Sequence, residues 1–318
     1  MKKALRHALP LTLLLATTGL AQAQQCGGDL GTFLEGVKAT DADVKVDTRY
    51  VTNYYDTAAA KELAISMIND NKADILWGVA GLSGNGAAEA ALESGKAWFI
   101  GVFAAAMTSA TSVANINADK VVGFVGGEDS PVINDFLYGF LEGVKATDPE
   151  VKVDTRYVNS YVDTATAKEM GLSMISDNKA DILWGVAGLS GNGAAEAALE
   201  SGKAWFIGVD SDQEATFSAE LAAITLTSGL KNVGQSIIWI FDEWDAGRTY
   251  WGQLVNLGLT EGGVGIVADK NFANVAPKAV QDKVLAAEAA IKDGTIVVPS
   301  AIGDDTNAVI ALRDSMQP

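Results

Sequence analysis

The second half of the chain carries polar, aromatic and glycine residues where predicted strands end, and these residue types could hold a small ligand. Asp210 ends the apolar run AWFIGV, so its carboxylate could accept two hydrogen bonds from neighbouring hydroxyl groups. Lys231 could donate to a ring oxygen or nitrogen, and Trp184 could stack on a planar ring. The other candidates at the same predicted edge are Asp129, Tyr161 and Gly188. Together they suit a flat, neutral small molecule that carries hydroxyl groups.

Each candidate also has a purely structural interpretation. Asp210 could cap the following helix, although Asp212 is better placed for that role. Trp184 could be a core aromatic, and its position alone leaves both interpretations open. Simple exposure or a role in a turn is the alternative for Tyr161, Lys231 and Asp129.

Two glycine-containing segments invite comparison with nucleotide-binding motifs. GLSGNG (188–193) opens a predicted helix, so its amides could hold an anion or a polar edge. It is not G-x-G-x-x-G, and it follows the third predicted strand rather than the first. ESGKA (200–204) lacks the first glycine and the Ser or Thr of a P-loop. Neither segment predicts a nucleotide site by itself.

The candidate residues are positioned by alternating predicted strands and helices. The predicted strands are 121–127, 151–158, 180–188, 204–210, 224–228 and a last one, TIVVPS (295–300). The predicted helices are 131–146, 164–175, 192–201, 233–245 and 276–292, and 252–267 is predicted to be extended. Such a β-α-β-α order predicts a doubly wound parallel sheet with helices on both faces. Ligands of such sheets bind beyond the carboxyl ends of the strands.

The chain contains a long internal duplication. Residues 34–102 recur as residues 141–209 with ten differences across 69 aligned positions. The first copy reaches Phe103 where the second has Asp210. The equivalent of the strand-like segment 120–127 is 13–20, the apolar part of the N-terminus. We therefore expect the first copy to form an incomplete lobe, irregular or unstable, because a missing central strand leaves backbone groups unpaired.

The N-terminus has the pattern of a secretory signal. A basic start precedes an apolar stretch (11–15) and an A-x-A motif (21–23). We predict cleavage after Ala23 and a periplasmic protein. Lipidation of Cys26, which would give a membrane-anchored lipoprotein, is the alternative, although two glutamines precede it where small residues are expected.

Composition excludes several classes of function. The formal charge is −17 and the single histidine, His7, lies in the predicted leader. A mature chain without histidine has no Ser-His or Cys-His nucleophile pair and no imidazole metal site. The acidity argues against nucleic acid or anionic lipid as partners. We therefore expect no enzyme, no cofactor and no metal.

The second half resembles the basic membrane protein family, whose best-known members are purine-nucleoside receptors of ABC transporters. The matching text includes GFVGGEDSPVINDFLYGFLEGVKATDPEVKV, ADILWGVAGLSGNG, GVDSDQ, LTSGLKNV and GLTEGGVGI, and it extends from about residue 101 to 300. The resemblance implies a two-lobed, type I-like periplasmic binding protein with a permease partner. By motif, Trp184 would lie against the base, Asp210 would hold the ribose hydroxyls and Lys231 would reach the purine. Gly188 and Tyr161 would line the pocket.

The chain departs from the family at its first lobe. The family opens with a strand and an Asp-x-Ser-Phe-Asn type segment, of which only residues 28–33 and 101–108 remain here. The predicted organisation is a leader (1–23), an incomplete first lobe (24–118), a second lobe with the ligand residues (119–230) and a segment that crosses between lobes (231–318). The alternatives are a sugar receptor, an enzyme such as a nucleoside hydrolase or an NAD-dependent enzyme, and a folding variant without function.

Overall fold

The computed structural model describes residues 11–16, 45–51, 75–79, 87–250, 255, 257–301 and 306–318. The chain divides into two compact units, Met1–Glu89 and Ala90–Pro318. The strands form two sheets, one of three strands and one of six.

Unit 1 contains a parallel sheet in the order β2-β1-β3, built from β1 (Leu11–Ala16), β2 (Val46–Val51) and β3 (Ile75–Val79). Leu11 lies opposite Val46 and Ile75. In the second copy Val122 lies opposite the equivalents of those two residues, at 153 and 182. The apolar segment of the predicted leader therefore occupies the central position that the first copy lacks. Loss of residues 1–23 would remove that strand.

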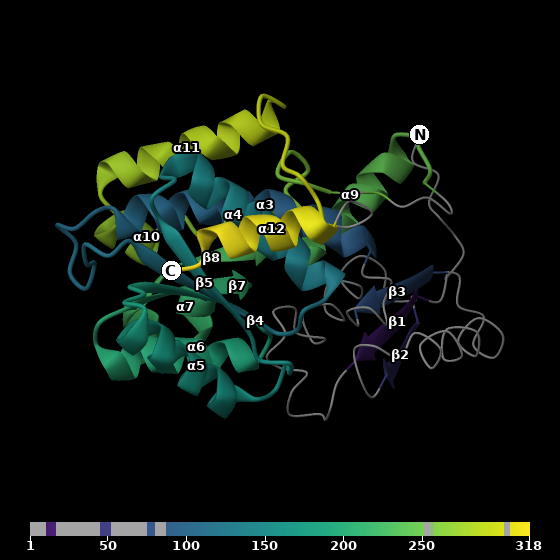
Figure 1. Ribbon diagram of the computed structural model, residues 1–318. Coiled ribbons are helices and arrows are strands. Elements are labelled where there is room, and N and C mark those ends of the chain that lie inside the picture. The colour runs from purple at the N-terminus through teal and green to yellow at the C-terminus, as the bar shows by residue number, and fades with distance from the viewer. Residues whose placement is uncertain are drawn as a thin grey trace. The chain divides into compact units, whose positions relative to one another are not determined.

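Unit 2 contains a six-stranded sheet in the order β5-β4-β6-β7-β8-β9, and the prediction of a mainly parallel α/β sheet is confirmed (Figure 1). Its strands are β4 (Val121–Gly126), β5 (Lys152–Tyr157), β6 (Ile182–Val186), β7 (Trp205–Asp210), β8 (Thr225–Lys231) and β9 (Val264–Ile266). Only β9 is antiparallel to its neighbour. Its helices are α3 (Ala87–Thr108, of which the residues from Ala90 belong to unit 2), α4 (Pro131–Thr147), α5 (Thr164–Asp177), α6 (Ser190–Ser201), α7 (Gln213–Thr216), α8 (Ala219–Ala223), α9 (Val233–Asp245), α10 (Lys270–Val275), α11 (Lys278–Lys292) and α12 (Thr306–Met316).

The pleat of the central strands divides unit 2 into two cores. In β6, Ile182 and Trp184 belong to the core that includes residues of α3 and α4, whereas Leu183 belongs to the core with α5 and α6. Figure 1 shows α5 and α6 on one face of the sheet and α3, α4 and α12 on the other. This alternation follows from the two-residue period of a strand buried on both faces.

The same amino-acid sequence folds differently in the two copies. Residues 87–102 and 194–209 have the same sequence, yet the first run lies within one helix, α3. In the second run α6 ends at Gly202, which has a left-handed φ of 59°, and the chain continues into β7. The residues that follow differ: FAAAMT in the first copy consists largely of good helix formers, and DSDQEA in the second does not. The identical stretch thus takes its conformation from its neighbours.

Helix α3 packs closely against α4. A Cβ on Gly101 would lie 2.2 Å from the carbonyl oxygen of Phe140, and a Cβ on Gly143 would lie 1.9 Å from that of Trp98. The two helices therefore approach each other where neither has a side chain. The predicted boundary between residues 118 and 119 falls inside unit 2.

The C-terminal segment differs from the prediction. TIVVPS forms no strand; Val297 is 85% exposed, and the chain is held instead where Ser300 Oγ and the Ala301 amide donate to the buried Asp135 carboxylate at 2.6 and 2.7 Å. Helices α10 and α12 were not predicted. Within the predicted extended segment 252–267, only β9 is a strand among the described residues.

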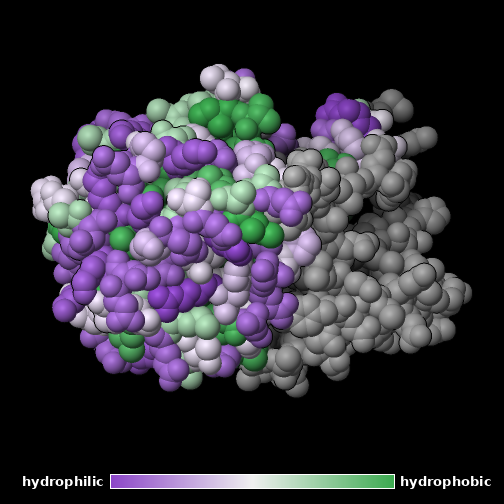
Figure 2. Space-filling view, viewed as in Figure 1, coloured by the Kyte–Doolittle hydropathy of each residue, from purple (hydrophilic) through white to green (hydrophobic). Residues whose placement is uncertain are grey.

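The visible face of unit 2 is mainly polar. Figure 2 shows a mainly hydrophilic face over the described part of unit 2, with small hydrophobic patches between polar ones. Of the helices in the described ranges, none has both the length and the apolarity that crossing a membrane requires.

Candidate functional site

Five of the six predicted site residues lie at the carboxyl edge of the unit 2 sheet. Asp129 follows β4, Tyr161 follows β5 and Gly188 follows β6, while Asp210 and Lys231 are the last residues of β7 and β8. Because neighbouring parallel strands end at the same edge, the topology brings these residues to one rim. We call them the rim residues.

Asp210 and Lys231 form the charged part of the rim. The Lys231 Nζ lies 3.7 Å from Asp210 Oδ2, and 43% of the Asp210 side chain is exposed. Asp210 has a φ of 65°, in the left-handed region that residues other than glycine rarely adopt, asparagine and aspartate more often than most. The Ser211 amide donates to the Val209 carbonyl at 2.8 Å, so the chain turns directly after the strand. A carboxylate and an ammonium are thus presented together where two strands end.

Tyr161 and Gly188 join the loops that follow β5 and β6. The Ser190 amide donates to the Tyr161 carbonyl at 3.1 Å, and the Ser190 hydroxyl donates to the Ser160 carbonyl at 3.0 Å. Gly188 has a φ of 55°, and a Cβ there would lie 3.3 Å from the Tyr161 carbonyl oxygen. A side chain at residue 188 would therefore be strained and crowded, which fits a backbone-lined part of the rim.

Asp129 is exposed and takes part in a local hydrogen-bond chain. Asn134 Nδ2 donates to Asp129 Oδ1 at 2.7 Å, and the Tyr157 hydroxyl donates to Asn134 Oδ1 at 2.6 Å. Burial is the main cause that raises the pKa of Tyr157 to about 12, and the Asp129 charge adds to it. Ser130, not Asp129, occupies the N-cap position of α4.

Trp184 lies away from the rim, in the core. It is the third of the five residues of β6 and is 0% exposed. Its ring centroid is 5.0 Å from that of Phe140, 5.6 Å from Phe124 and 6.0 Å from Phe136, and its Nε1 donates to the Gly208 carbonyl at 3.1 Å. A side chain in mid-strand points to a face of the sheet rather than beyond its end. Of the two interpretations, the core aromatic fits this position, and Trp184 is not a rim residue.

Asp212 has the capping role that the sequence indicates. Its carboxylate accepts from the Ala215 amide at 3.2 Å, and it also pairs with Lys270 of α10. The neighbouring Gln213 was not among the predicted site residues. It contacts both β7 and β8, and the only sequence signal for it is its place in GVDSDQ.

Other features of the described residues lie away from the rim. A cavity of about 770 Å³ is lined by residues such as Asn117, Ser173, Lys179 and Lys203, which precede strands or belong to α5 and so mark the opposite, amino edge. No rim residue lines it, so we do not connect it with the predicted site. In the part of the chain that the structure describes, no group of His, Cys, Asp and Glu is arranged to hold a metal ion.

Comparison with known proteins relates most of the chain to one family. The family described as "ABC transporter substrate-binding protein PnrA-like" matches residues 28–113 and 96–301. The "ABC transporter nucleoside-binding protein BmpA" of Lactococcus lactis is 31% identical over 207 residues, which are 61% of this chain and 57% of that protein. "Basic membrane protein A" of Borreliella burgdorferi is 32% identical over 184 residues, 54% of this chain and 52% of that protein. The match thus spans little more than half the length of these relatives.

Solved structures show the same fold. An ABC transporter solute-binding protein from Aeropyrum pernix has a TM-score of 0.70 at 19% identity and covers 96% of this chain and 98% of its own. A second one, from Conexibacter woesei, has a TM-score of 0.62 at 18% identity and covers 92% of this chain and 99% of its own. At such identities the likeness concerns the fold alone.

Proposed function

Because the chain belongs to the PnrA-like family of ABC transporter substrate-binding proteins, we propose that it binds a purine nucleoside at the carboxyl edge of the unit 2 sheet. It would act outside the cytoplasm and deliver the ligand to the permease of an importer. A relative named for nucleoside binding supports this choice of ligand. Catalysis is not part of the proposal.

The observation that carries the proposal is the Asp210–Lys231 pair at the ends of β7 and β8. A carboxylate with much of its side chain exposed can accept two hydrogen bonds from the vicinal hydroxyls of a ribose. The ammonium beside it can donate to an oxygen or nitrogen of the attached purine. The fixed spacing of adjacent strands would set the distance between the two contacts.

The remaining rim residues would complete the contact surface on this unit. Tyr161 is the aromatic side chain at the rim, and it is partly buried against the loop of Gly188. Asp129 offers a second carboxylate near the end of β4. Residues 28–33, the remnant of the family's first-lobe opening, lie outside the described residues.

Calorimetric titration of the purified chain with guanosine and adenosine tests the proposal. Loss of one charge-assisted hydrogen bond costs about 1.5–3 kcal/mol, so D210N should weaken nucleoside binding about 10- to 150-fold. K231Q should weaken it by at least about tenfold on the same grounds. K168Q is the matched control, because Lys168 pairs with Glu200 at 2.8 Å between α5 and α6, and its affinity should equal that of the wild type.

Three results would redirect the proposal. Absence of a saturable heat at millimolar guanosine and adenosine would refute nucleoside binding. Saturable binding of ribose or xylose, without binding of nucleosides, would instead support a sugar receptor that uses the same carboxylate. Release of ribose from inosine would indicate a nucleoside hydrolase.

A further inference from the structure

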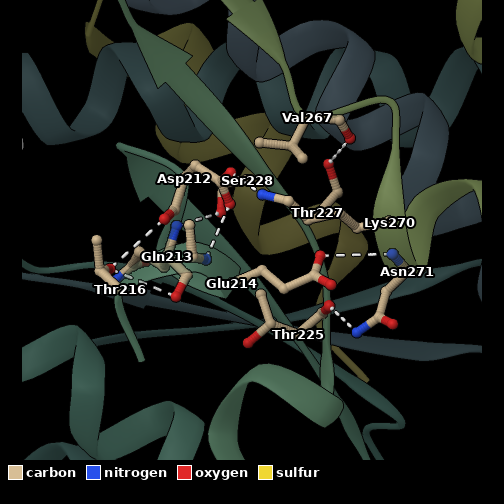
Figure 3. A network of polar contacts seen from close by, with 11 residues as sticks. Asp212, Gln213, Glu214, Thr216, Thr225, Thr227, Ser228, Val267, Lys270 and Asn271 are labelled. Atoms are coloured by element: carbon tan, nitrogen blue, oxygen red, sulfur yellow. Dashed lines mark hydrogen bonds and ion pairs between the residues drawn. The ribbon is translucent and has the colours of Figure 1, made fainter. Parts of the chain in front are cut away.

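Gln213 connects three elements of unit 2. Its Oε1 accepts from the Val209 amide at 2.9 Å, and its Nε2 donates to Asn192 Oδ1 at 3.3 Å. Its own backbone amide donates to Ser228 Oγ at 3.2 Å. Figure 3 shows Gln213 beside Ser228 within the network that joins α7 to β8 and α10. One side chain and its backbone thus bind the end of β7, the start of α6 and the middle of β8.

The space for this side chain depends on Gly208. A Cβ on Gly208 would lie 2.7 Å from Gln213 Oε1 and 2.4 Å from Ser228 Oγ. Any side chain at residue 208 would therefore displace the glutamine or the serine. The absence of a side chain at Gly208 leaves the space that Gln213 occupies. Both Gly208 and Ser228 are buried.

The residue next to the Gln213 contact is Asp210, whose left-handed φ of 65° is unfavourable for a residue with a Cβ. Such a conformation persists only where the surrounding contacts determine it. The hydrogen bond from the Val209 amide to Gln213 fixes the Gly208–Val209 peptide, which lies one peptide unit before Asp210. A change of this peptide would rotate the carboxylate away from Lys231.

We propose that Gln213 is a positioning residue that holds the Asp210 carboxylate in the orientation that selects a ligand with vicinal hydroxyls. This proposal rests on the proposed function, because it assigns the recognition of the diol to Asp210. Gln213 itself touches no ligand. Its effect on binding passes through the Val209 peptide and the conformation of Asp210.

The test compares guanosine with 2′,3′-dideoxyguanosine, which lacks the diol. In the full-length wild type, guanosine should bind at least about 10- to 150-fold more tightly, because this is the range for the loss of one charge-assisted contact and dideoxyguanosine loses both hydroxyls. The methionine of Q213M has nearly the same shape as glutamine but neither accepts nor donates hydrogen bonds. The ratio of the affinity for guanosine to that for dideoxyguanosine should therefore fall toward its value in D210N, while the affinity for dideoxyguanosine stays unchanged. In the D210N background Q213M should have no further effect on the ratio. Q281M is the matched control, since Gln281 of α11 donates to the backbone carbonyls of Ala273 and Ala276.

A second measurement, amide hydrogen exchange of Val209, needs no ligand. Exchange should be faster in Q213M than in the wild type and slow again in Q213E, which keeps the acceptor. If the wild type shows no preference for guanosine, the proposed function fails, and the exchange of Val209 still decides whether Gln213 fixes this peptide. If the wild type shows the preference and Q213M keeps it, the positioning role is refuted and the proposed function stands. A fall of the ratio in Q281M equal to that in Q213M would also refute it, since any loss of stability would then explain the result.

Discussion

The two copies offer a paired test of their different conformations, because Gly95 and Gly202 are equivalent glycines with the same neighbours in the sequence. Gly95 lies inside α3, whereas Gly202 ends α6 with a φ of 59°. Both belong to unit 2. The change to alanine should therefore act on the stability of the same unit in opposite directions.

The magnitudes follow from the backbone. A left-handed alanine costs about 1–2 kcal/mol, and the less flexible unfolded chain returns about 0.4–1 kcal/mol. G202A should thus lower the free energy of unfolding by roughly 0.5–1.5 kcal/mol, and no atom lies within 4 Å of the new Cβ to add a clash. Replacing a glycine within a helix gains about 0.5–1 kcal/mol, so G95A should raise the free energy of unfolding by that amount.

Urea unfolding followed by circular dichroism measures both changes as shifts of the midpoint at constant slope. A second pair keeps the test decisive if alanine at residue 95 meets a neighbour. S201A removes a hydroxyl that donates to the Ala198 carbonyl at 2.9 Å and accepts from the Lys203 amide at 3.1 Å, so it should destabilise, whereas S94A should stabilise a helix interior. If both alanines in the first copy destabilise as much as those in the second, then α3 contains a turn like that after α6, and the reasoning is wrong.

Three further changes test the rim, a buried acid and unit 1. D210G should be more stable than D210A by about 1 kcal/mol, because only glycine relieves the left-handed strain; an alanine variant of equal or greater stability in urea would show that residue 210 is extended. Burial raises the pKa of Asp181 from 3.8 to about 7, so the folded chain holds a proton that the unfolded chain has lost, and stability should fall by up to about 4 kcal/mol as pH rises from about 4 to about 7. Urea midpoints at pH 5 and 7.5 should differ in the wild type and not in D181N, and an equal difference in both would assign it to another group. A chain that begins at residue 24 lacks β1, so amides of β2 and β3 should exchange faster than those of β5 and β6; equal protection would show that unit 1 does not need this strand.

Much of unit 2 was predictable because its local patterns and its packing agree. The predicted helices 131–146 and 164–175 correspond to α4 and α5, and Gly202 ends α6 as expected. Apolar residues four apart in 131–146 and the glycine after 192–201 indicate helices that the packing also stabilises. The prediction of a strand at TIVVPS was wrong because β-branched composition alone does not supply a neighbouring strand. The segment is held by hydrogen bonds to Asp135 instead.

The candidate site was predictable to the extent that topology determines it. Parallel strands end at one edge, so residues after five strands meet there whatever their side-chain details. To place Trp184, the end of β6 must be known to within two residues. Trp184 precedes the last residue of this strand by two positions and therefore lies in the core rather than at the rim. Gln213 was missed because a glutamine in the first turn of a helix after two aspartates resembles an ordinary exposed residue, and its contacts to Val209 and Ser228 exist only after folding.

The residues that end the duplication decide both conformation and chemistry. After Val209 the second copy continues with Asp210, which ends β7, and with Gln213, which fixes the Gly208–Val209 peptide near the end of this strand. The first copy carries Phe103 and Ala106 at these positions, and α3 continues through them. The repeated sequence therefore contains neither the residues that follow Val209 and end the strand nor the carboxylate proposed to bind ligand. It follows that duplication of residues 141–209 can reproduce strands such as β2 and β3 without reproducing a binding site.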